Sequence, residues 1–198
     1  HDDCPDNVCF LHEGGDRAAT DAAFEKAEHV ITQRLVINRV QAMTMEPRSC
    51  IGHFNPVEGL YTVYTTLQGV HPYRSGLANG VLKVPENKVR VIGGDVGGSF
   101  GMKSSIYPEV ALAIWASKRL ERPVKWISER SEAFLSDYAA RDNVTVGELA
   151  LDKDGKFLGQ RIRTIASLGA YLSPTGVNPP VANLGTLAGV YTTPAIHV

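Results

Sequence analysis

The sequence predicts an α+β fold built in layers, with a mixed β-sheet packed by helices. Two observations favour this fold class. Between about residues 60 and 127 strand-like and helix-like segments alternate, which is typical of parallel strands joined by helices. The last third reads instead as successive strands, residues 144–151 and 157–165, joined by a turn at Asp152-Lys153-Asp154-Gly155.

The N-terminal part predicts a linker, a short helix and three strands. Residues 1–16 are polar and turn-rich, so we expect a linker that arrives from a preceding domain and one domain over 17–198. Thr20 is the expected N-cap of a helix that runs to about Glu28. The expected strands are the β-branched run 30–40 and a hairpin of 50–54 with 60–67.

The middle of the chain predicts two helices, each followed by a strand. Pro72 can open a helix that ends before Pro85, and residues 88–92 form the next strand. Pro108 can open a second helix, before a strand at 124–127. That second helix is apolar on nearly all sides and is therefore expected to be buried. Residues 172–189 are proline- and glycine-rich and predict an irregular or partly helical connection.

The composition excludes several classes of protein. Apolar residues make up 43% and charged residues 21%, as in ordinary globular proteins. A formal net charge of −1 gives no reason to expect nucleic acid or an anionic membrane as partner. No apolar run reaches the roughly 20 residues of a membrane-spanning helix. Three cysteines, Cys4, Cys9 and Cys50, indicate reduced thiols in a cytoplasmic protein, with a local Cys4–Cys9 disulfide as the alternative.

A glycine-rich loop directly after the strand at 88–92 is the main candidate for chemistry. Five glycines fall within Gly93–Gly101, around Ser99 and Phe100. Successive N–H groups of such a loop can turn inward and bind an anion, although a tight turn is the simpler alternative. The spacing fits neither the dinucleotide-binding fingerprint nor the phosphate-binding P-loop, because Met102 precedes Lys103-Ser104.

Gln68 becomes a second candidate through topology. Strand 60–67, helix 72–83 and strand 88–92 predict a β-α-β unit with parallel strands. Gln68 and the glycine loop then both follow the carboxyl ends of parallel strands, where ligands of α/β sheets bind. Taken alone, Gln68 would be an ordinary turn residue.

Other polar residues carry weaker signals. Glu46 and Arg48 flank Pro47, and a structural ion pair is the preferred interpretation. Arg130, Glu132, Arg141 and Asp142 are expected to form caps and solvated pairs. The histidines show no metal-ligand spacing, and His71 alone lies near the candidate site.

These residues bring out a family resemblance. The segment Asp95–Lys103 resembles the glycine-phenylalanine-glycine motif of the large, molybdopterin-binding subunits of xanthine dehydrogenase, aldehyde oxidase and carbon monoxide dehydrogenase. Further similar segments occur in the family's order: Met45–Arg48, Leu67–His71, Tyr107–Glu109, Trp126–Asp137, Arg141–Asn143 and Leu168–Tyr171. The resemblance covers essentially the whole chain and is greatest to carbon monoxide dehydrogenase-like large chains.

The resemblance implies a first part of a molybdopterin-binding domain, cut from a longer protein. The family's cofactor is molybdenum in molybdopterin cytosine dinucleotide, and its reaction is oxidative hydroxylation of an aldehyde, an N-heterocycle or a CO-like molecule. Gln68 would support the metal site, and Gly97, Gly98, Ser99, Phe100 and Gly101 would contact the cofactor. The implied partners are a medium FAD subunit and a small [2Fe–2S] subunit, in a heterotrimer that dimerises.

Departures from the family limit what can be inferred. Ser99 replaces a glycine of many relatives, so a positive φ at that position would be strained. Ser104 replaces the substrate-binding Glu of purine-oxidising members, which argues against a purine substrate. The substrate-facing loop and the catalytic base fall beyond Val198 in the family pattern, so the isolated chain is expected to be folded, free of cofactor and inactive. The alternatives are a phosphate- or nucleotide-binding module without redox chemistry, and a scaffold domain that contacts other subunits.

Overall fold

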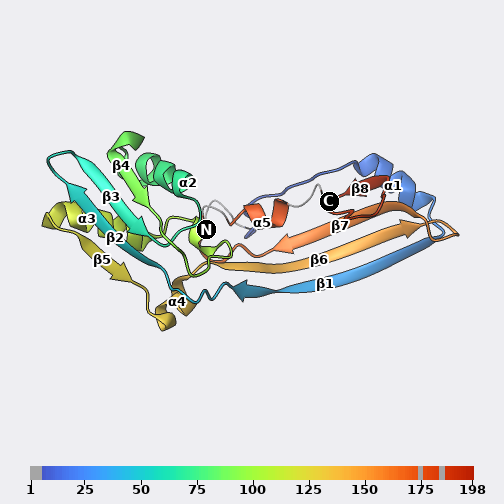
Figure 1. The fold of residues 1–198 in the computed structure, drawn as a ribbon. Helices are drawn as coiled ribbons and strands as arrows, with labels where there is room; N and C mark the ends of the chain where they lie inside the picture. The colour runs from blue at the N-terminus through green and yellow to red at the C-terminus, as the bar shows by residue number, and fades with distance from the viewer. Residues whose placement is uncertain (1–5, 174–175, 183–185) are drawn as a thin grey trace. The chain divides into compact units, whose positions relative to one another are not determined.

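The computed structural model describes residues 6–173, 176–182 and 186–198. It forms two compact units (Figure 1). Among the described residues, unit 1 comprises 6–40, 141–172, 176–182 and 186–198, and unit 2 comprises 41–140 and residue 173. Each unit has a four-stranded mixed sheet with helices, so the predicted α+β class with mixed strand pairing and packed helices is confirmed, with two sheets where one was expected.

Unit 1 contains the sheet with strand order β1-β6-β7-β8. Strands β6 and β7 pair antiparallel, and β7 and β8 pair parallel. Asp152 shapes the predicted β6–β7 turn, because its Oδ1 accepts hydrogen bonds from the N–H groups of Asp154 and Lys156, both at 2.9 Å. The elements are α1 (Arg17–Glu25), β1 (His29–Gln41), β6 (Ala139–Leu151), β7 (Phe157–Ala166), α5 (Asn178–Val181) and β8 (Ala195–His197).

The start of helix α1 differs from the prediction. Asp16, not Thr20, is the N-cap, and its carboxylate accepts from the N–H of Ala19 at 2.9 Å. Thr20 is buried one turn inside the helix, where its hydroxyl donates to the carbonyl of Asp16 at 2.7 Å. A carboxylate is as good an N-cap as a hydroxyl, and Asp16 lies closer to the start of the apolar run, so Thr20 was the wrong choice. Gly15 pairs with His197 of β8 in an isolated antiparallel bridge.

Unit 2 contains the sheet with strand order β4-β3-β2-β5. Strands β2 and β3 form the predicted hairpin, and β3 and β4 are parallel, which confirms the β-α-β unit. The elements are β2 (Ser49–Asn55), β3 (Leu60–Thr65), α2 (Val70–Ser75), the π-helix η1 (Gly76–Leu82), the 3₁₀ turn η2 (Glu86–Lys88), β4 (Val89–Ile92), the 3₁₀ turn η3 (Met102–Ser104), α3 (Pro108–Leu120), β5 (Val124–Ile127) and α4 (Arg130–Ser136).

Helix α3 begins at the predicted proline, but the expected burial on nearly all sides is wrong. Its inner face packs on the sheet, where Val110, Ala113 and Ile114 are at most 4% exposed. Leu112 and Trp115 on the other face are 59% and 60% exposed. The reason is geometric, because the described residues place a sheet against only one side of this helix.

The apolar core of unit 2 lies where the sheet meets α2, η1 and α3. It consists of the buried residues Cys50, Tyr61, Val63, Leu67, Tyr73, Leu77, Ala78, Val89, Val91, Val110, Ala113 and Ile114. Leu67 belongs to this core and is adjacent to Gln68, so the packing fixes the start of the loop that carries Gln68. In the described ranges, no helix has the length and apolar character needed to cross a membrane.

Candidate functional site

Gln68 and the glycine loop lie side by side at the ends of the parallel strands β3 and β4. The side-chain oxygen Oε1 of Gln68 accepts hydrogen bonds from Ser99 Oγ at 2.6 Å and from the N–H of Gly101 at 3.0 Å. The N–H of Gln68 also donates to the carbonyl of Lys103 at 3.1 Å. The juxtaposition predicted from the β-α-β topology is therefore confirmed.

These contacts fix the orientation of the Gln68 amide. The Gly101 N–H can only donate, so the atom of Gln68 that faces it must be the oxygen. Gln68 is exposed, and no described residue accepts a hydrogen bond from its Nε2. The side chain thus holds the loop through its oxygen, and its two N–H donors have no acceptor among the described residues.

The backbone of the loop takes left-handed conformations at three positions. Gly98 has φ +97°, Phe100 φ +53° and Gly101 φ +90°. Ser99 is not among the residues with positive φ, so the strain considered for Ser99 in the sequence falls on Phe100 instead. The Phe100 side chain is 83% exposed, so packing of this ring does not enforce the conformation.

Only part of the loop is free to bind something else. The N–H groups of Gly97, Gly98 and Gly101 donate to Glu46, Val96 and Gln68 respectively. The carbonyl of Gly101 accepts from the N–H and the hydroxyl of Ser104. Among the described residues, none accepts from the N–H of Ser99 or of Phe100. The open donors of the site are therefore these two amides and Gln68 Nε2, whereas Gly101, for which the resemblance implied contact with the cofactor, uses its polar groups within the protein.

Beneath the loop lies an ion pair between the buried Lys103 and the partly exposed Glu46, which the sequence did not predict. Lys103 is 1% exposed, and its Nζ lies 2.9 Å from Glu46 Oε2 and 2.8 Å from the Glu46 carbonyl oxygen. Burial acts to raise the pKa of Glu46, but the hydrogen bonds from Lys103 and from the Gly97 N–H, with the lysine charge, outweigh it and hold this pKa below its ordinary value. The sequence feature that could have indicated a buried lysine is the position of Lys103, just after the glycine loop and next to the apolar Met102.

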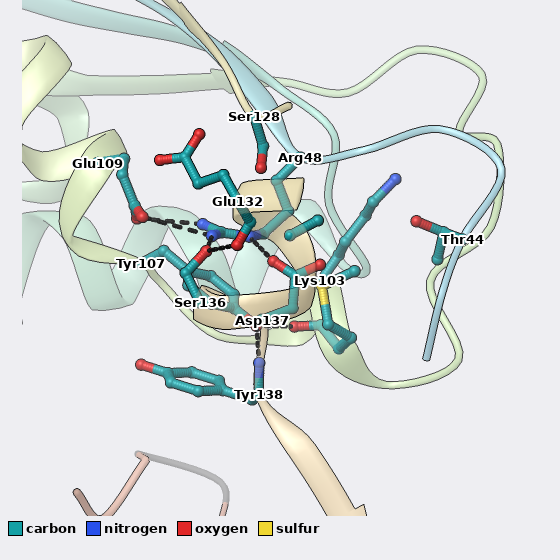
Figure 2. Close-up of polar contacts among 12 residues, drawn as sticks. Thr44, Arg48, Lys103, Tyr107, Glu109, Ser128, Glu132, Ser136, Asp137 and Tyr138 are labelled. Carbon is teal, nitrogen blue, oxygen red and sulfur yellow. Dashed lines mark hydrogen bonds and ion pairs between the residues drawn. The ribbon is translucent and has the colours of Figure 1, made fainter. Parts of the chain in front are cut away.

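Glu46 and Arg48 do form structural ion pairs, but not with each other. Figure 2 shows Arg48 between helices α3 and α4. Its guanidinium donates to Asp137 Oδ1 at 2.5 Å, to Glu109 at 3.1 Å and to Ser136 Oγ at 3.0 Å. It also lies 3.6 Å from the centre of the Tyr107 ring. The proline between Glu46 and Arg48 separates two independent networks.

The weaker candidates serve structural roles. Arg130 donates to the carbonyl of Met45 at 3.0 Å, and Asp142 pairs with Arg39 at 2.8 Å. The carbonyl of Glu132 accepts from Ser136 Oγ, and His71 is exposed on α2. Within the described ranges no three His, Cys, Asp or Glu side chains gather as a metal site. Cys9 and Cys50 carry free thiols, and Cys4 lies outside the described residues.

Comparison with known proteins places this geometry in a family. The sequence matches the family described as "Molybdopterin cofactor-binding domain" over residues 1–198. It is 38% identical to the carbon monoxide dehydrogenase large chain of Hydrogenophaga pseudoflava, over 96% of this chain and 24% of that protein. It is 37% identical to the 6-hydroxypseudooxynicotine dehydrogenase complex subunit gamma of Paenarthrobacter nicotinovorans, over 88% of this chain and 22% of that protein.

The fold agrees with a solved structure from the same group. The reconstituted CO dehydrogenase from Oligotropha carboxidovorans superposes with a TM-score of 0.86 at 33% identity, over 94% of this chain and 23% of that one. The chain spans about a quarter of the length of the curated relatives that it matches. Since the family match extends over every residue, the chain belongs to the molybdopterin cofactor-binding domain family.

Proposed function

We propose that this chain supplies part of the cofactor site of the molybdenum-containing large subunit of an oxidoreductase. Gln68 and the loop Gly97–Gly101 would hold the cofactor. The observation that carries the proposal is the contact between Gln68 and the loop: Gln68 Oε1 accepts from Ser99 Oγ and from the Gly101 N–H. Next to this contact, Gln68 Nε2 and the N–H groups of Ser99 and Phe100 have no acceptor among the described residues.

The donor set fits an oxygen-rich group. Amide N–H groups of this kind bind phosphate and metal-oxo oxygens, and they need no conformational change when the backbone is already fixed. Gln68 Nε2 would hydrogen-bond an oxygen around the metal, and the Ser99 and Phe100 amides would orient neighbouring cofactor atoms. Gly97 and Gly98 would shape the loop. When bound, the cofactor supplies the two-electron chemistry of an oxidative hydroxylation.

The finer points of the proposal follow the family pattern. We expect the cytosine dinucleotide form of molybdopterin, a catalytic base outside these 198 residues, and an inactive isolated chain. The curated relatives act on carbon monoxide and on a nicotine derivative by their names, so the substrate class extends from CO-like molecules to aldehydes and N-heterocycles.

The partner subunits form a further part of the proposal. We expect a medium FAD subunit and a small [2Fe–2S] subunit, in a heterotrimer that dimerises in the cytoplasm. Two of the similar proteins carry names that denote one subunit of a larger assembly, a large chain and a complex subunit gamma. A purified native complex that lacks flavin and iron would contradict these partners.

The Gln68→Glu substitution in the full-length complex tests the proposal. A glutamate can still accept from Ser99 and Gly101, but it loses both N–H donors. We expect the loop to keep its conformation while turnover per bound molybdenum falls by about 10- to 100-fold, the usual effect of removing a supporting contact around a metal. Molybdenum analysis and pterin release measure how much cofactor is bound, and steady-state kinetics then give the turnover per bound molybdenum.

A matched variant and two contrary results complete this test. Gln33→Glu alters an exposed glutamine of β1 and should leave turnover unchanged. A wild-type complex without molybdenum and pterin would reject the proposal. Tight binding of a simple mononucleotide by such a complex would point instead to a nucleotide-binding module.

A further inference from the structure

We propose that Glu46 and Lys103 act as a positioning pair that clamps the glycine loop from beneath, so that the Ser99 and Phe100 amides stay open toward the bound group. The identity of the group that the loop binds rests on the proposed function. The clamp itself rests on contacts within unit 2. Neither residue touches the open donors directly, so their role would be exerted through the backbone.

The first half of the clamp is at the start of the loop. Glu46 Oε2 accepts both from the N–H of Gly97 and from Lys103 Nζ, each at 2.9 Å. The N–H of Glu46 donates back to the Gly97 carbonyl at 3.2 Å, so the two backbones are paired in both directions. The contact is close enough to exclude a side chain, because a Cβ on Gly97 would lie 2.6 Å from Glu46 Cβ.

The second half of the clamp is at the end of the loop. The N–H of Lys103 donates to Ser99 Oγ at 3.2 Å, and its carbonyl accepts from the N–H of Gln68 at 3.1 Å. Lys103 therefore joins the loop to Gln68 through its backbone and to Glu46 through its ammonium group. Lys103 thus links the backbone of Gln68 to both ends of the loop.

The backbone carbonyl of Glu46 is also held by hydrogen bonds. The hydroxyl of Thr44, which is 2% exposed, donates to the Glu46 carbonyl at 2.5 Å. The same carbonyl accepts from Lys103 Nζ at 2.8 Å. The ammonium group thus has two protein acceptors that do not depend on solvent, which is what a fully buried charge requires.

The clamp would help to maintain the left-handed backbone conformation of Phe100. A non-glycine residue at φ +53° persists only where its surroundings impose that conformation. The exposed Phe100 ring does not impose it. The turn bond from the Met102 N–H to the Ser99 carbonyl, at 3.0 Å, holds it locally, and the anchors at Gly97 and Lys103 fix the segments on either side of this turn. Release of either anchor should let the loop relax, which would turn the two open amides away from their present direction.

Hydrogen exchange in the full-length protein prepared without cofactor tests the clamp. Lys103→Met removes the charge from a linear side chain, and Glu46→Ala removes the acceptor from a partly exposed position. We expect amides of residues 97–104 to exchange about tenfold faster in each variant, because a hydrogen bond to a charged group is lost. Amides of β6 and β7 should keep their protection. The double variant should be no faster than either single one if the pair acts as a unit.

Two matched controls separate the clamp from a general loss of charge. Glu86→Gln breaks the exposed Arg74–Glu86 pair, whose N–O distance is also 2.9 Å, and Lys118→Met removes a lysine of the same unit that contacts Tyr61. Neither should change exchange at 97–104. Glu46→Ala leaves the buried Lys103 ammonium without its carboxylate, so if one of the two variants fails to fold, the other carries the test alone.

A cofactor measurement on the loaded complex gives the second readout. Both clamp variants should retain several-fold less molybdenum and pterin per protein after gel filtration than the wild type does. Unchanged exchange at 97–104 in either folded single variant would overturn the clamp. A wild-type complex with no molybdenum or pterin would overturn the proposed function and leave the exchange result valid, so the two failures are distinguishable.

Discussion

Phe100 shows how a single residue can carry the strain of a binding loop. A left-handed conformation costs an ordinary side chain about 1–2 kcal/mol, and glycine adopts it at no such cost. The loop has glycine at two of its three left-handed positions and phenylalanine at the third. The sequence could predict a strained loop but placed the strain on Ser99, because a motif does not show which residue of a glycine run turns.

The two glycines Gly97 and Gly101 resist substitution for different reasons, which gives a prediction. Gly97→Ala would put its Cβ 2.6 Å from Glu46 Cβ, so it should break the contact and speed amide exchange at the loop. Gly101→Ala meets nothing within 4 Å but has φ +90°, so it should lower stability by about 1–2 kcal/mol. Amide hydrogen exchange at the loop and the free energy of unfolding in urea, measured for both variants, check these two expectations. Equal loop exchange in the two variants would show that the Gly97–Glu46 contact is unimportant.

Contacts between residues far apart in sequence were predicted only where the topology of the fold fixes them. Gln68 and the glycine loop were found because a β-α-β unit has a fixed topology. Lys103 and Glu46 were missed as partners, because no local periodicity relates a loop lysine to a glutamate at the end of another segment. The family resemblance implied that Gly101 contacts the cofactor, but in the structure its N–H already donates to Gln68 Oε1.

At the level of elements, Arg48 joins β2 to two helices. It precedes Ser49 of β2 and contacts Glu109 of α3 and Ser136 of α4, with Asp137 at the end of α4 (Figure 2). The short helix α4 was not predicted, since its Phe134 and Leu135 are exposed and give no amphipathic pattern. Helix α3 was predicted because a proline marks its start. Polar contacts across elements, rather than apolar periodicity, hold α4.

Loss of Arg48 should therefore destabilise several elements together. Arg48→Met leaves the Asp137 carboxylate, whose side chain is 2% exposed, without its charged partner. We expect a loss of about 3–5 kcal/mol in the free energy of unfolding of unit 2, as for other broken buried pairs. Chemical denaturation followed by amide exchange in β2 and α3 measures it. Arg74→Met, which breaks an exposed pair, should cost less than about 1 kcal/mol, and an equal cost in the two variants would contradict this account.

On the scale of the whole chain, the apolar core defined above belongs entirely to unit 2. The sequence predicted a mixed sheet with packed helices, but neither the second sheet nor the division into two units. Hydrophobic patterns assign residues to helices and strands, yet they do not show which strands share a sheet when the partners are distant, as for β1 and β6.

Cys50 offers a chemical measure of that core. Burial raises the pKa of the Cys50 thiol to about 11, so its reactive thiolate is scarce at neutral pH and Cys50 should be labelled only when unit 2 opens. Exposed Cys9 should react at once. Arg48→Met should speed the labelling of Cys50, and Arg161→Met, which breaks the pair with Asp21 in unit 1, should not. Peptide mass spectrometry after timed alkylation checks this, and rapid labelling of native Cys50 would refute it.

The position of β1 in the chain has a consequence for synthesis. This strand ends at Gln41, but its sheet neighbour β6 begins only at Ala139, after all the strands of the other sheet. On the ribosome, β1 emerges long before its partner exists, while the intervening sheet can already assemble. During that interval its apolar side chains, among them Val30, Ile31, Leu35, Val36 and Ile37, have no neighbouring strand. Nascent β1 is thus an unpaired apolar strand for most of the synthesis of this chain, and such strands are prone to aggregate.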